Sequence, residues 1–330
     1  PPTPVRPGKS TVSTEGEVHD RINPDWPTLY TADQLPYGLG PRVPMMAISP
    51  WSKGGYVCSE VFDHTSVIRF IEKRFGVSEP NITPWRRAVC GDLSSAFDFS
   101  RPDDRFVSLP STKHYVATVH HESTLAAPVV PEEQPVAIHP QEAGLRRRRP
   151  LAYATRLHLR AQAEGVELHI HNPAPVGVVC TAYWEGSHAL PHHYTVGAGA
   201  QLKDTLRSPN GQDLALMVYG PDGFIRGLYG KGASPLQVDA EGLRTGDLRL
   251  TLHSNATQQI EIRDRVYGQD SRRFSLAAGE TREVLWPLAS SHHWYDLEVQ
   301  THSHRWQLAG HVETGEESWS DPANTKPVLI

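Results

Sequence analysis

Disulfide frameworks, zinc sites and membrane-spanning segments all lack support in this sequence. The chain has only three cysteines, Cys58, Cys90 and Cys180, and none of them falls in a CxxC spacing. At most one disulfide can form, and free cysteines of this kind are usually small buried residues. No apolar run approaches the roughly 18 residues that cross a bilayer. The sequence therefore predicts neither a transmembrane helix nor a cysteine-based metal site.

The motifs of several large enzyme classes are also missing. The sequence contains no GxxxxGK, no GxGxxG and no HExxH, which excludes the usual phosphate-loop, dinucleotide-binding and zincin sites. The formal net charge is -5, whereas nucleic-acid binding goes with a strongly basic domain, so we expect no nucleic-acid partner. The chain begins PPTPVRPGKST without an initiator methionine, and we expect a processed product or part of a longer sequence.

The amino-acid composition and the spacing of apolar residues change along the chain. Residues 1 to about 35 are rich in proline and poor in apolar residues, which predicts an extended arm on the surface. Residues 37–99 have an α/β pattern. Within them, 43–48 form a short and nearly continuous apolar run, which is typical of a strand that is covered on both faces.

A helix is predicted directly after this strand and its loop. Asp63, Thr65 or Ser66 can cap the amino end, and Gly76 ends the helix. The apolar residues recur at helical spacing, while the positions between them are charged and predicted to face water. The apolar positions are Val67, Ile68, Ile71 and Phe75.

The stretch from 100 to 150 is rich in proline and charge, with only 115–119 as a short helix or strand. We expect a linker over 111–150. The arginine run 146–149 has two interpretations. It contacts anionic lipid headgroups, or it is a solvated and protease-sensitive part of the linker, which we favour.

Beyond residue 150 apolar and polar residues alternate with a period of two, between turns of Asn, Gly and Pro. This pattern is typical of half-exposed antiparallel strands. The stretch that begins GVELHIHN is echoed about eighty residues later by the one that begins DLRLTLHSN. The duplication predicts two tandem β-sandwich modules, at 151–236 and 237–330.

Candidate site residues gather between 38 and 66. Arg42, in the segment GLGPRVP, can bind phosphoryl oxygens or merely follow a tight turn. Lys53, beside a glycine pair, can face an anionic substrate or remain in a solvated loop. Asp63 and His64 can bind a metal or transfer a proton, but helix capping accounts for Asp63 more simply.

Histidine is abundant, with 18 in the chain. His302 and His304 share one face if they lie on a strand. No third ligand follows from the spacing, so the sequence predicts no metal site there.

The strings RVPMMAISPWSKGG, VFDHTSVIRFIEKRFGV and EPNITPWRRAVCGDLSSAFDF resemble the C-terminal part of the catalytic domain of bacterial phosphatidylcholine-hydrolysing phospholipases C. These belong to the acid-phosphatase-related phosphoesterases, within the alkaline-phosphatase-like superfamily. The duplicated half looks like the paired β-sandwich modules that follow that domain. The resemblance implies a partial alkaline-phosphatase-like α/β domain over 1–110, followed by an all-β part.

The implied activity is hydrolysis of phosphatidylcholine or sphingomyelin to diacylglycerol or ceramide and phosphocholine, by a secreted or periplasmic bacterial enzyme that meets a phospholipid or membrane surface. In this family the nucleophile lies mainly in the N-terminal half of the catalytic domain, which has no counterpart here. Only Arg42, Lys53, Asp63 and His64 therefore carry over, as substrate-binding residues at the edge of the site. The cofactor is undetermined, and a divalent metal is compatible with the complete enzyme.

We expect this chain alone to be inactive. Two alternatives stay open. The chain is a non-catalytic fragment whose β-sandwiches bind a membrane or a protein, or it is a phosphomonoesterase of the same superfamily. The paired β modules weigh against the phosphomonoesterase, since simple acid phosphatases of this group generally lack them.

Overall fold

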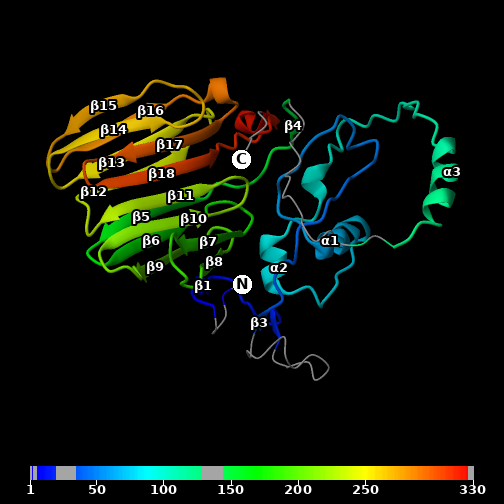
Figure 1. Cartoon of the computed structure of the whole chain (residues 1–330), viewed down its shortest axis with the longest axis horizontal. Helices are drawn as coiled ribbons and strands as arrows, with labels where there is room; N and C mark the ends of the chain where they lie inside the picture. The colour runs from blue at the N-terminus through cyan, green and yellow to red at the C-terminus, as the bar shows by residue number, and fades with distance from the viewer. Residues whose placement is uncertain (1, 3–5, 20–34, 128, 130–143, 326–330) are drawn as a thin grey trace.

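The computed structural model describes residues 2, 6–19, 35–127, 129 and 144–325. Figure 1 shows two parts: a large block of strands, formed mainly by residues from 156 onward, and beside it the segment 35–127 with short helices and extended loops. The prediction of an all-β C-terminal part is confirmed, because no α-helix follows residue 150 within the described residues. None of the described helices is long and apolar enough to span a bilayer.

The strands of the β part fall into two successive sets of seven. The first set is β5 (Arg156–Gln162), β6 (Gly165–His171), β7 (Val178–Trp184), β8 (His192–Val196), β9 (Gln201–Arg207), β10 (Asp213–Tyr219) and β11 (Ile225–Lys231). The second is β12 (Leu236–Gly242), β13 (Leu248–Ser254), β14 (Gln258–Asp264), β15 (Arg272–Leu276), β16 (Thr281–Trp286), β17 (Trp294–Gln300) and β18 (His304–His311). Each set has three strands in one sheet, in the order β5-β6-β9 or β12-β13-β16. The repeat seen in the sequence thus has the same strand pattern in both copies.

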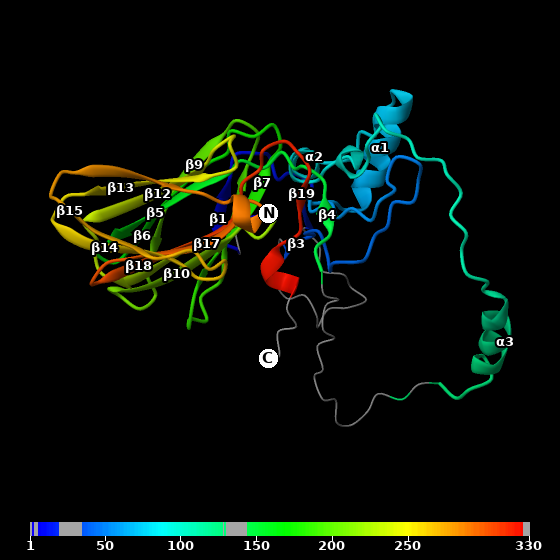
Figure 2. The same cartoon turned by 90° about the horizontal axis from the view of Figure 1, so that it is seen from above.

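The other four strands of each set belong to one continuous sheet. Its order is β1-β8-β7-β10-β11-β18-β17-β14-β15, with β1 at Gly8–Ser10. The two sets meet where β11 pairs antiparallel with β18, from Ile225 opposite Ala309 to Gly230 opposite His304. Figure 2 shows the three-stranded sheets as one layer over this nine-stranded sheet. The two repeats are therefore joined side by side by backbone hydrogen bonds.

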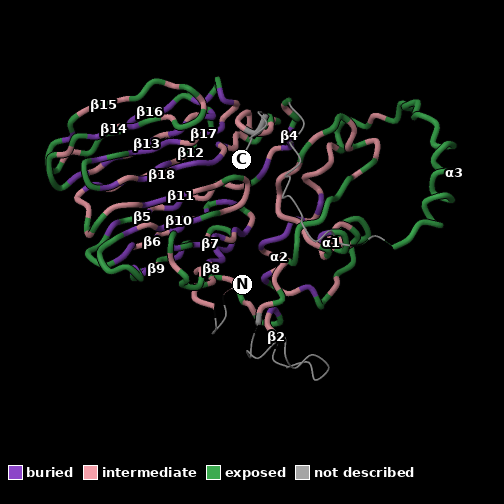
Figure 3. The backbone as a smooth tube through the Cα atoms, viewed as in Figure 1, coloured by how far each residue is buried: buried purple, intermediate pink, exposed green. Residues whose placement is uncertain are grey.

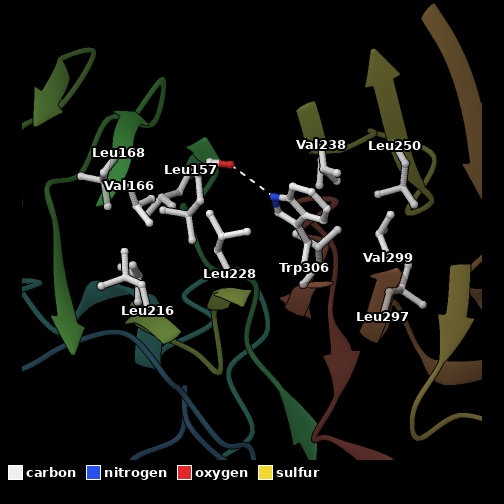
Figure 4. Packing of buried hydrophobic residues seen from close by; sticks show 14 of the residues in the cluster. Leu157, Val166, Leu168, Leu216, Leu228, Val238, Leu250, Leu297, Val299 and Trp306 are labelled. Atoms are coloured by element: carbon white, nitrogen blue, oxygen red, sulfur yellow. Dashed lines mark hydrogen bonds between the residues drawn. The ribbon is translucent and has the colours of Figure 1, made fainter. Parts of the chain in front are cut away.

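A single apolar core lies between the layers. Period-two alternation directs one face of each strand inward, as in β6, where Val166, Leu168 and Ile170 are fully buried. In Figure 4, Leu168 faces Leu216 in the first repeat. Trp306 lies between the repeats and donates its indole N–H to the carbonyl of Leu159 at 3.3 Å. One buried cluster includes residues of both repeats, so the cores of the two repeats are continuous.

The N-terminal arm is part of the sheet, not only a surface loop. Strand β1 pairs in parallel with β8. Gly8 has φ of +141°, and a Cβ there would lie 1.8 Å from the carbonyl oxygen of His193, so only glycine allows this approach. Strand β2 (Val18–His19) pairs with β3 (Leu35–Pro36), and the rest of the predicted arm, 20–34, lies outside the described residues.

Helix α1 (His64–Phe75) follows the sequence prediction closely. Asp63 is the N-cap, its side chain accepts the backbone N–H of Thr65, and Ser66 completes a capping box. Gly76 ends the helix in the left-handed conformation, with φ of 68°. The predicted apolar stripe is present but uncovered, because Val67, Ile68, Ile71 and Phe75 are all exposed.

The predicted strand at 43–48 is wrong. No strand is assigned there, and Met46 and Ile48 are 84% and 91% exposed. Pro44 has no N–H to donate to a sheet, and within the described residues no layer covers this run. Figure 3 shows the contrast, with burial concentrated in the strands and exposure along 35–127.

The remaining elements connect the two parts. Helix α2 (Pro84–Val89) and the 3-10 turn η1 (Ser94–Ala96) follow α1. Helix α3 (Lys113–Glu122) includes the short element expected at 115–119, and all its residues are exposed. Further on, β4 (Arg147–Arg148) pairs with β19 (Ser318–Trp319). There are also two 3-10 turns. The turn η2 (Ala289–Ser291) lies between β16 and β17, and η3 (Pro322–Thr325) follows β19.

Because the repeats share one sheet and one core, we expect them to unfold together. Leu168→Ala and Leu250→Ala remove corresponding buried side chains of the first and second repeat, and each costs about 2–5 kcal/mol. Each variant should speed amide hydrogen exchange equally in β6 and β13. The exposed control Leu285→Ala should change exchange little. Faster exchange confined to the mutated repeat would show that the repeats unfold independently.

Candidate functional site

The four residues nominated from the sequence do not converge. Arg42 is exposed, and no described residue forms an ion pair with it. Lys53 pairs with Asp103 at 3.3 Å. Asp63 caps α1, and His64 is exposed in the first turn of that helix. Among the described residues, these four side chains make no hydrogen bond or ion pair with one another.

Asp63 is held by a network that the sequence did not reveal. Arg86, on α2, contacts Asp63 at 2.6 Å and the fully buried Glu17 at 2.9 Å. Thr83 also donates its hydroxyl to Glu17, at 2.5 Å. Burial alone would raise the pKa of Asp63, but hydrogen bonds from Thr65 and Arg86 lower it below the ordinary value. Asp63 is therefore an ionised structural group that ties α1 to α2.

A second polar cluster lies where the linker meets the β part. Arg148 contacts Asp222 at 2.8 Å and Glu313 at 2.7 Å, and the side chains of all three are at most 9% exposed. Its guanidinium also lies over the ring of Trp294, 5.2 Å from the centroid. Burial raises the pKa of Asp222, and the nearby Arg148 opposes this without cancelling it. The arginine thus pairs with two carboxylates from different repeats, both largely buried.

The interpretation of 146–149 as a solvated linker is wrong for Arg148 and Arg149, whereas Arg146 and Arg147 are exposed. Arg148 and Arg149 are buried, at 2% and 5% exposure. Arg149 pairs with Glu317, and its guanidinium lies 3.8 Å from the centroid of the Tyr56 ring. Charge alone suggested solvation because the carboxylates that pair with these arginines are distant in the sequence.

The same cluster contains a possible metal-ligand set. Asp222, His311 and Glu313 place one ligand atom each within 4.8 Å of one another. Arg148 already bridges the two carboxylates, and His311 contacts Glu313 at 2.9 Å, so these ligands have partners within the chain. His304, which was considered with His302 in the sequence, contacts the carbonyl of Gly232 at 3.0 Å and so has a structural partner. The His-x-Glu spacing at 311–313 is the sequence signal that was missed.

The two parts of the chain meet at α2. Trp85 is almost fully buried and donates its indole N–H to the hydroxyl of Thr195, on β8, at 2.9 Å. Gly177 donates to the carbonyl of Ala88 at 2.8 Å, and a Cβ at this glycine would lie 2.7 Å from that oxygen. The close backbone approach therefore requires glycine.

A pocket of about 650 Å³ lies at this junction. Its walls come from both parts of the chain and are mainly apolar. Its lining includes Arg6, Leu39, Val61, Val179, Tyr183 and His193. Pockets of this size at an interface between parts of a protein are typical small-molecule sites.

Comparison with known families agrees with this architecture. The model of the phosphoesterase family matches residues 3–78. The model of the bacterial phospholipase C C-terminal domain matches residues 149–231 and 233–311, which correspond to the two repeats. The chain therefore belongs to the bacterial phospholipase C family of phosphoesterases.

Three relatives that match most of this chain are named phospholipase C. The non-hemolytic phospholipase C of Pseudomonas aeruginosa is 42% identical over 87% of this chain and 44% of its own length. That of Burkholderia pseudomallei is 38% identical over 96% of this chain and 46% of its own. The hemolytic phospholipase C of Pseudomonas aeruginosa is 35% identical over 96% and 47%. The chain thus spans about half the length of these relatives.

Removing the central cation of the linker cluster should destabilise the protein. In Arg148→Met, Asp222 and Glu313 lose their shared buried partner, which should cost about 3–5 kcal/mol in the free energy of unfolding. Urea denaturation measures this. The matched control is Arg147→Met, since that side chain is about half exposed and should cost less than about 1 kcal/mol. Equal stability of the two variants would contradict a structural role for Arg148.

The lowered pKa of Asp63 predicts a pH dependence. A carboxyl group whose pKa is lower in the folded state stabilises the protein above its unfolded pKa, and this contribution is lost as pH falls through the folded value. The free energy of unfolding should therefore drop below about pH 3.8, the ordinary value. Asp63→Asn keeps a capping side chain but should lack this part of the slope. Parallel pH profiles of the two proteins, measured by denaturation, would refute the assignment.

Proposed function

We propose that this chain is the C-terminal part of a phospholipase C that hydrolyses the headgroup phosphodiester of phosphatidylcholine, and also of sphingomyelin, releasing phosphocholine. The relatives that match most of the chain are named phospholipase C. A secreted or periplasmic location in a bacterium accords with this function. The nucleophile is supplied by a further part of the catalytic domain, which packs against segment 35–127.

The uncovered apolar surface of that segment is the observation that carries this proposal. Most of the exposed large apolar side chains among the described residues lie between 37 and 129, including the stripe of α1 and the run 43–48. In the β part such side chains are few, with Tyr183 and Tyr219 forming one edge-to-face pair, as is normal for a protein surface. The many exposed apolar side chains of this one segment support an interface with another part of the protein. The segment thus forms one side of a larger α/β domain, of the alkaline-phosphatase-like kind.

The chemistry assigns limited roles to the nominated residues. Attack of an activated hydroxyl on phosphorus depends mainly on positioning and on stabilising the developing negative charge. Arg42 is exposed and without an ion pair among the described residues, so it can bind phosphoryl oxygens. Lys53 can do so only by leaving Asp103. Asp63 has a structural role at the start of α1, and His64 is exposed in the first turn of that helix.

The domain division that goes with this proposal is 1–110 for the catalytic part, 111–150 for the linker, and 151–236 and 237–330 for two β-sandwich modules. The matched ranges 149–231 and 233–311 support the last two. A purely binding role of the β part draws little support from its surface, where exposed large apolar residues are few. A phosphomonoesterase is disfavoured by the match to the phospholipase C C-terminal domain.

A fusion tests the proposal. The N-terminal part of the Pseudomonas aeruginosa non-hemolytic phospholipase C, up to the region that this chain matches, is joined in frame to this chain. The fusion should release phosphocholine from phosphatidylcholine vesicles, whereas this chain alone and the N-terminal part alone should release none. A folded, monodisperse fusion without activity would refute the proposed function. Release by this chain alone would refute the need for a second part.

A further inference from the structure

The pocket between segment 35–127 and the β part has the chemistry of a lipid site. Leu39 and Val61 line it from one side, and Val179 on β7 lines it from the other, with Tyr183 next to them. Gly177 and Trp85, which also line it, are held by hydrogen bonds across the junction. The apolar walls are therefore fixed by the same contacts that join the two parts, and the pocket is preformed.

Polar groups in the pocket are cationic or hydrogen-bond donors. Arg6 and His193 line it, and none of its lining residues is Asp or Glu. The Nε2 atom of His193 is buried and has no hydrogen-bond partner among the described residues. Burial, with the nearby Arg6, lowers the pKa of this imidazole, which favours its neutral form, and Arg6 supplies the charge. A buried polar atom without a partner is costly unless a ligand or water satisfies it.

We propose that this pocket binds a single fatty acyl chain of a phosphate-bearing lipid, with the chain against Val61 and Val179 and the phosphate at Arg6 and His193. The volume of about 650 Å³ lies within the range of small-molecule sites. Each methylene of an apolar chain that is buried tightens binding about fourfold, and an arginine favours phosphate oxygens. The inference rests on the proposed function, because a phospholipase C meets such lipids as substrates.

Charge and apolar chain can be separated with simple probes. Binding of dodecyl phosphate, below its micellar concentration, is measured by calorimetry on the full chain. Butyl phosphate carries the anion without the chain, and dodecyl maltoside carries the chain without the anion. Dodecyl phosphate should bind at least tenfold more tightly than either probe, since one lost charged contact or several lost methylenes each exceed a factor of ten.

Three variants locate the site. Arg6→Gln should weaken dodecyl phosphate at least tenfold and leave dodecyl maltoside unchanged. Val61→Phe, which fills the pocket, should weaken both. Arg207→Gln is the matched control, since this arginine is highly exposed and lies outside the pocket. Thermal unfolding of each variant shows whether it is folded. If Val61→Phe is not folded, Arg6→Gln alone tests the location of the lipid site.

The proposal is overturned if dodecyl phosphate does not bind up to about 1 mM, or if Arg6→Gln and Arg207→Gln bind it equally. Binding is measured without turnover, so these failures leave the proposed function standing. Conversely, an inactive fusion protein together with normal, Arg6-dependent binding would refute the phospholipase activity and keep the lipid site.

Discussion

The antiparallel pairing of β11 with β18 organises the molecule. It joins the two repeats into one nine-stranded sheet and places the start of β11 beside the end of β18. Asp222 precedes the first of these strands and Glu313 follows the second, so both carboxylates reach Arg148. Because Arg148 lies on β4, which leads out of the linker, the position of the linker depends on that pairing. A buried ion pair of this kind fixes one arrangement more than it adds stability.

Segment 35–127 is held to this framework by few but specific contacts. Trp85 donates to Thr195, and Gly177 donates to Ala88. Both contacts are buried, and they connect α2 to β8 and to the residue just before β7. The apolar pocket is the space left beside them. Its walls are shaped by an interface between two kinds of structure, which is where small-molecule sites commonly form. The lipid site and the attachment of the segment therefore share one structural basis.

Several local features could be predicted because they depend on neighbouring residues only. The cap at Asp63, the end of α1 at Gly76 and the alternation in β6 and β13 follow from backbone chemistry and side-chain period. The run 43–48 misled because an apolar sequence specifies a preference for burial, not the partner that provides it. The nominated residues share the same limit, since proximity in sequence at Lys53, Asp63 and His64 did not bring their side chains together.

The sequence by itself determined the family, the β character of the C-terminal half and its duplication. The family follows from long matching strings, and the other two follow from the period-two alternation and its repetition. Only the tertiary structure decided that the repeats share one core, that Arg148 and Arg149 are buried, and that Arg6 and His193 line an apolar pocket. Each of these depends on contacts between residues far apart in the chain. Such contacts are selected by the packing of the whole molecule, which no local pattern encodes.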